Sequence, residues 1–100
     1  MDRVEVVIET GADAGWRFTC LITSTSGDER SIDLGLSWAD YDLWAPGGSI
    51  PPRQVAIAVL SLLLEHAGKD LPDRLDASRV RRLVPGADDL LPGLARKSTP

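Results

Sequence analysis

The segment at residues 51–67, PPRQVAIAVLSLLLEHA, constrains the fold more than any other part of this chain. Ser49 can act as its N-cap, prolines are tolerated in a first helical turn, and Gly68 suits the left-handed residue that ends many helices. We therefore predict one helix about 22 Å long. Its polar side chains fall in a narrow stripe when residues are placed about 100° apart, and apolar side chains fill most of the remaining circumference. Such a helix must be buried on several sides, by a sheet and by the C-terminal segment, a partner subunit or both.

Three segments before this helix alternate between apolar and polar residues, which is the pattern of strands buried on one face. They are residues 3–9, 16–24 and 30–38. Short turns rich in Gly, Asp, Ser and Thr join them, so an antiparallel meander is the simplest topology. The side chains predicted to face the helix are Val4, Val6, Ile8, Trp16, Phe18, Cys20, Ile22, Ile32, Leu34, Leu36 and Trp38.

The link between the strands and the helix, residues 39–49, is long for a compact domain. It has two possible structures: a short fourth strand at residues 41–44, or a helical turn capped by Ser37. After the long helix, Asp76 is a suitable N-cap for a short helix at residues 77–84. A further turn at residues 87–91 would end before Pro92.

These elements predict an α+β fold. We expect a three- or four-stranded antiparallel meander, with one long helix packed across its apolar face and a short C-terminal helix. Residues 1–94 would form a single domain, and residues 95–100 a flexible tail.

Composition and charge restrict the functional classes. The chain of 100 residues has a net charge of −4, with −6 in its first half and +2 in its second. An acidic first half disfavours nucleic acid as the partner. The uninterrupted apolar run in the helix is about 10 residues, against roughly 20 for a membrane span. A lone cysteine and the lack of a signal-peptide pattern favour a cytoplasmic location, and nine Arg against two Lys is typical of GC-rich bacterial genomes.

The first candidate site spans the end of the third strand segment and the start of the link. Trp38, Tyr41 and Trp44 are three of the five aromatic residues, and they lie among the acids Asp40 and Asp42. Aromatic side chains with one polar end are favoured at binding surfaces. We therefore predict a partner-binding surface here, with a structural role at the rim of the core as the alternative. The D-x-D spacing alone is too weak to predict a metal site, and we expect no metal or other cofactor.

Arg79, Arg81 and Arg82 form the second candidate surface, with Arg74 upstream. Guanidinium groups suit phosphate and carboxylate partners. These arginines would also be explained as a solvated face, or as partners for the acidic first half of the chain. If the acids of one subunit paired with the arginines of another, this pairing would hold an oligomer together.

No catalytic constellation stands out, so we do not expect an enzyme. His66 falls in the last turn of the long helix, where a structural role is expected. Cys20 falls in an apolar row, where a free cysteine behaves as a small hydrophobe. The leading hypothesis is a protein-interaction module that forms a homo-oligomer, most simply a dimer, through the long helix or an open sheet edge. The alternative is a ligand-binding or regulatory subunit with a pocket between the Trp38–Trp44 segment and the start of the long helix.

Overall fold

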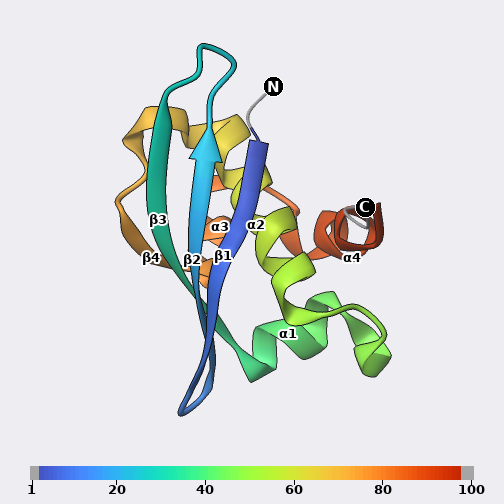
Figure 1. Ribbon diagram of the computed structural model, residues 1–100. Coiled ribbons are helices and arrows are strands. Elements are labelled where there is room, and N and C mark those ends of the chain that lie inside the picture. The colour runs from blue at the N-terminus through green and yellow to red at the C-terminus, as the bar shows by residue number, and fades with distance from the viewer. Residues whose placement is uncertain (1–2, 98–100) are drawn as a thin grey trace.

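The structure is a computed structural model that describes residues 3–97, which form an α+β fold with helices packed on one side of a four-stranded sheet (Figure 1). The strands are β1 (Arg3–Ala12), β2 (Gly15–Thr23), β3 (Glu29–Ser37) and β4 (Arg74–Asp76). The helices are α1 (Trp38–Trp44), α2 (Pro52–Ala67), α3 (Val80–Leu83) and α4 (Ala87–Lys97). Short 3-10 turns are η1 (Pro46–Gly48), η2 (Gly68–Asp70) and η3 (Ala77–Arg79).

The antiparallel meander of β1, β2 and β3 is confirmed, but the sheet is mixed rather than purely antiparallel. Its order is β1-β2-β3-β4, and β4 pairs in parallel with β3 at Asp33, Leu34 and Gly35. β4 therefore lies at the opposite edge of the sheet from β1 (Figure 1). Three residues around a single buried Leu75 are too few to give a strand pattern in the sequence.

A bulge in β1 changes which side chains face the core. Val4 and Val6 pair with Ile22 and Cys20 and are half-buried, as predicted. The register then shifts, and Ile8 pairs with Thr19 on the outer face. An extra residue in one strand moves every later side chain to the other face. The prediction that Ile8 faces the helix is therefore wrong, and Ile8 is 55% exposed.

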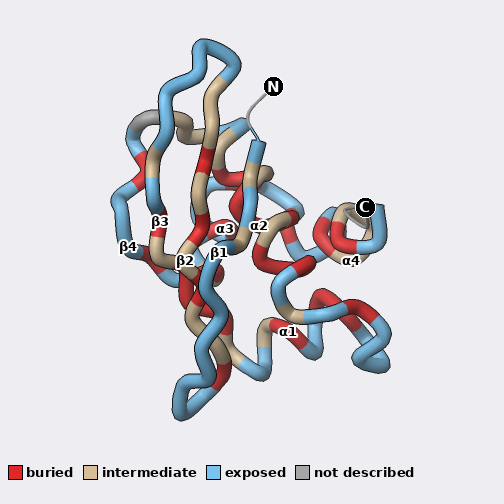
Figure 2. The backbone as a smooth tube through the Cα atoms, viewed as in Figure 1, coloured by how far each residue is buried: buried red, intermediate tan, exposed pale blue. Residues whose placement is uncertain are grey.

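The core lies between the sheet and α2, in which buried residues recur along the helix (Figure 2). The sheet covers one side, and α3 and α4 cover the other. The C-terminal segment therefore provides the second cover that the sequence requires. The expected N-cap is wrong: Pro51 is the N-cap residue and makes no side-chain cap, whereas Gly68 ends the helix with φ of 52° as expected.

The C-terminal segment is more helical than predicted. Asp76 caps η3 by accepting from the Ser78 amide at 3.0 Å, and α3 continues it to Leu83. α4 runs through Pro92 to Lys97, so the predicted end before Pro92 is wrong. Proline removes one helical hydrogen bond, but a face of Ala87, Leu91 and Ala95 is buried and keeps the helix docked.

The first part of the tail predicted for residues 95–100 is instead helical, because α4 extends to Lys97. Ala95 is fully buried, and its backbone carbonyl accepts a hydrogen bond of 2.6 Å from the side-chain Nε2 of the buried Gln54 in α2. Residues 98–100 lie outside the described residues.

Candidate functional site

Ser37 determines the structure of the first candidate site. Its backbone is extended, and its hydroxyl oxygen accepts from the Asp40 amide at 3.1 Å. This is the N-cap arrangement that starts a helix. The helical alternative for the link is confirmed, and the alternative of a fourth strand at residues 41–44 is wrong.

Two of the three aromatic residues of α1 point into the protein. Tyr41 is 9% exposed, and its hydroxyl donates to the Ile50 carbonyl. Trp44 is fully buried, and its indole N–H donates to the Asp88 carboxylate at 2.9 Å. These contacts tie α1 to the start of α2 and to α4, in the region where the ligand-binding alternative placed a pocket.

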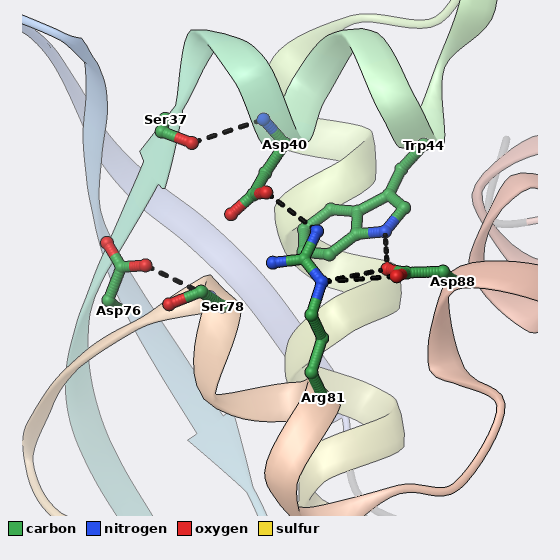
Figure 3. A network of polar contacts seen from close by, with 7 residues as sticks. All are labelled: Ser37, Asp40, Trp44, Asp76, Ser78, Arg81 and Asp88. Atoms are coloured by element: carbon green, nitrogen blue, oxygen red, sulfur yellow. Dashed lines mark hydrogen bonds and ion pairs between the residues drawn. The ribbon is translucent and has the colours of Figure 1, made fainter.

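Arg81 lies at the centre of a polar network that joins three helices (Figure 3). Its Nη2 donates to Asp40 Oδ1 at 2.7 Å, and its Nε lies 3.1 and 3.2 Å from the two oxygens of Asp88. The guanidinium carbon is 5.1 Å from the centre of the Trp44 ring, within the range of a cation–π contact. One arginine therefore holds α1, α3 and α4 together, and we call Asp40, Trp44, Arg81 and Asp88 the helix junction.

The electrostatics of the helix junction favour its charged forms. The Trp44 indole N–H, followed by the Arg81 guanidinium, lowers the pKa of Asp88 below its ordinary value. The hydrogen bond to Asp40 is the main cause that raises the pKa of Arg81. Both shifts favour the ion pair at neutral pH.

The helix junction takes one residue from the predicted arginine surface and two from the predicted aromatic surface. The acidic first half of the chain and the basic second half meet here inside one molecule. Asp40, Trp44 and Arg81 therefore contribute to the fold. The exposed residues of α1 are Trp38, Ala39, Asp42 and Leu43. A partner-binding role for these exposed residues stays a prediction.

Trp38 is the large aromatic residue that α1 leaves at the surface. It begins α1 instead of ending β3 and is 56% exposed, so the prediction that it faces the long helix is wrong. Its ring centre lies 4.8 Å from that of the half-buried Trp16. The Trp38 amide donates to the Ala14 carbonyl at 2.8 Å, which fixes the start of α1 against the turn between β1 and β2. Trp16 pairs with Gly11 of β1, a residue with no side chain to cover the ring. The two tryptophans thus make an aromatic surface at the end of the β1–β2 hairpin.

The open sheet edge that the sequence predicts is the edge of β1. Within the described sheet β1 has β2 as its neighbour and an open edge on the other side, and most of it is exposed (Figure 2). Val7 and Ile8 at the bulge are 52% and 55% exposed. The three consecutive apolar residues at 6–8 break the alternation, and this was the signal that could have indicated the bulge.

Arg79 and Arg82 lie away from the helix junction. Together with Arg74 they line a cavity of about 430 Å³ beside β4 and η3. The predicted cluster of three arginines is therefore divided: Arg81 belongs to the helix junction, and Arg74 replaces it beside the other two.

His66 and Cys20, the two side chains that the sequence analysis weighed for catalysis, lie where a structural role was predicted. His66 Nδ1 lies 3.0 Å from the Leu62 carbonyl, one turn earlier in α2. Burial, followed by the negative charge of Asp33, raises the pKa of Cys20 to about 11, so this thiol stays protonated at neutral pH. Among residues 3–97, no three His, Cys, Asp or Glu side chains are grouped to hold a metal ion.

Comparisons of the chain with protein-family models, curated proteins and solved structures found no match. None of the helices within residues 3–97 has both the length and the apolar character needed to cross a membrane.

Proposed function

We propose that this protein is a small interaction module that pairs with a second copy of itself through the free edge of β1. The observation that carries the proposal is this open edge, together with the exposed Val7 and Ile8 beside it. An unpaired strand presents a row of backbone donors and acceptors that another strand can complete. The surplus apolar surface of α2, the other expected route to a dimer, is already covered by α3 and α4.

The charges of β1 favour a copy of the same strand as the partner. Arg3 and Glu5 pair with Thr23 and Leu21, so both lie on the outer face of the sheet. In an antiparallel pair with Val4 opposite Val4 of the second copy, each Arg3 would lie opposite a Glu5. Opposite charges across strands contribute about 0.2–1 kcal/mol each. A register centred on Glu5 would oppose two carboxylates and is disfavoured.

Charged residues and a bulge on an edge strand also discourage indiscriminate pairing. The segment before the bulge, residues 3–6, is the regular part of β1 on which a selective pairing would form. A two-fold axis through Val4 places Arg3 of each copy opposite Glu5 of the other, which gives two ion pairs. This is the self-complementarity that a symmetric dimer requires.

The aromatic surface formed by Trp16 and Trp38 supports the same class of function. Tryptophan is enriched at protein interfaces, and Trp38 is 56% exposed on a helix start that is held in place by Ser37 and Ala14. We assign this surface to a protein partner other than the second copy.

Sedimentation equilibrium of wild type, Arg3→Glu and the charge-swapped Arg3→Glu/Glu5→Arg protein tests the β1 pairing. We expect the wild type to associate in the micromolar to millimolar range, from about 10 µM upwards, because a short ladder buries little surface. Arg3→Glu turns two attractive pairs into two repulsive ones and should weaken association about thirtyfold. The double variant should restore it.

A wild type that stays monomeric throughout this range would refute the pairing. Association that is equal in all three proteins would place the dimer on another surface. The control is Glu9→Arg, a charge reversal beyond the bulge on the same strand, which should leave the pairing unchanged.

A further inference from the structure

We infer that the cavity at the β4 edge binds a small organic phosphate, and that this site is separate from the β1 edge. The cavity measures about 430 Å³, within the range of small-molecule sites. Arg74 of β4, Arg79 of η3 and Arg82 of α3 line it, together with the hydroxyl-bearing Ser78. Three guanidinium groups around one hollow can supply the several charged hydrogen bonds that a phosphate accepts.

These arginines differ from those that serve the fold. Arg17, Arg30 and Arg81 each hold a carboxylate at 3.2 Å or less. Among the described residues, Arg79 and Arg82 have no ion pair, and Arg74 has only a looser contact of 3.8 Å with Asp33. The cavity therefore combines three arginines with a single lining carboxylate, Asp76, whose Oδ2 already accepts from the Ser78 amide.

A neighbouring cavity indicates what is attached to the phosphate. It measures about 320 Å³ and shares Pro72, Arg79 and Arg82 with the first. Its other lining residues are the apolar Ala67, Leu71 and Leu83 and the acidic Asp70. A ligand whose phosphate meets the arginines would place an apolar substituent against these leucines, so the site favours an organic phosphate over the free ion.

The overall charge disfavours a nucleic acid at this site. The chain has a net charge of −4, so a polyanion that extends beyond the cavity would meet a net negative charge in addition to the three arginines. A small ligand that stays within the cavity avoids most of that repulsion.

Titration of ¹⁵N-labelled full-length protein with inorganic phosphate and with phenyl phosphate, at constant ionic strength, tests the site. We expect saturable shifts of the amide resonances of Ser78, Arg79 and Arg82. Phenyl phosphate should bind about tenfold more tightly than inorganic phosphate, because its ring buries apolar surface against the leucines. The double variant Arg79→Gln/Arg82→Gln should stay folded, because both arginines are exposed. It should bind phenyl phosphate at least about tenfold more weakly than the wild type.

The matched control is Arg53→Gln, which removes an exposed arginine of α2 outside both cavities and should leave binding unchanged. Linear shifts that never saturate would overturn the assignment. Equal binding of phenyl phosphate by Arg79→Gln/Arg82→Gln and by the Arg53→Gln control would also overturn it. Benzoate binding as tightly as phenyl phosphate would replace phosphate by carboxylate as the ligand. A single-stranded DNA oligonucleotide that binds the same residues more tightly than phenyl phosphate would replace the small molecule by nucleic acid.

Discussion

Replacing Asp88 by alanine should show how much the helix junction contributes to stability. The substitution leaves the indole N–H of the buried Trp44 without its acceptor, and an unsatisfied buried donor costs about 1–3 kcal/mol. It also removes the partner of Arg81 Nε; Asp88 is 45% exposed, so this ion pair contributes at most about 1 kcal/mol. We expect the free energy of unfolding to fall by about 2–3 kcal/mol.

Urea unfolding followed by tryptophan fluorescence and far-UV circular dichroism measures this loss. A chain of this size unfolds with a slope of about 1–1.5 kcal/mol per molar urea, so the midpoint should fall by about 2 M. The matched control is Asp89→Ala, which removes the adjacent exposed acid from the same first turn of α4. That control loses only its interaction with the helix dipole, about 0.3–1 kcal/mol. Losses within about 0.5 kcal/mol of each other would refute the role assigned to Asp88.

Further predictions concern the pH dependence of the helix junction and the packing of one glycine. The pKa of Asp88 is lowered in the folded state, so its stabilising contribution is present above its ordinary unfolded pKa and is lost as pH falls toward the folded value. The stability difference between wild type and Asp88→Asn should therefore shrink as urea midpoints are measured from pH 7 to about pH 3, below the ordinary value near 3.9; a constant difference would contradict this. Gly15→Ala should destabilise by about 2–3 kcal/mol, because the new Cβ would lie 2.0 Å from the Leu36 carbonyl oxygen. Gly11→Ala, where nothing lies within 4 Å of the new Cβ, should change stability by less than about 0.5 kcal/mol. If urea unfolding gave an equally small loss for Gly15→Ala, the β1–β2 hairpin would accommodate both alanines and the prediction would be wrong.

The sequence predicted the fold well where local pattern and burial agree. The alternation of residues 16–24 and 30–38 gave the inner rows of β2 and β3, whose Phe18 and Leu34 are fully buried. The near-continuous apolar surface of α2 correctly required cover on two sides. Which element would supply that cover, the C-terminal segment or a second subunit, depends on long-range packing that no local pattern encodes.

Three features of the fold were not predicted, and the first two depend on contacts between distant residues. β4 is only three residues long and is defined by its pairing with β3. α4 continues through Pro92 because docking against α2 compensates for a lost hydrogen bond. The bulge at Val7 moved Ile8 to the surface, whereas strict alternation placed it in the core.

The candidate sites were predicted by residue type but not by arrangement. Grouping Trp38, Tyr41 and Trp44 by their proximity in sequence hid the fact that α1 turns the latter two inward. Arg81 and Arg82 are adjacent, yet one joins the helix junction and the other lines a cavity. Successive helical residues point in directions about 100° apart, so a cluster in sequence divides between two faces.

Hydrogen–deuterium exchange of the β1 amides at two protein concentrations tests the central claim, pairing through β1, most directly. The comparison is between about 10 µM and about 1 mM wild-type protein, with the exchange of β4 amides as the internal reference. Pairing between copies predicts that amides within residues 3–6 exchange more slowly at the higher concentration, while those of β4 are unaffected. Exchange of β1 that is the same at both concentrations would contradict the account, because the free edge would then have no partner in solution.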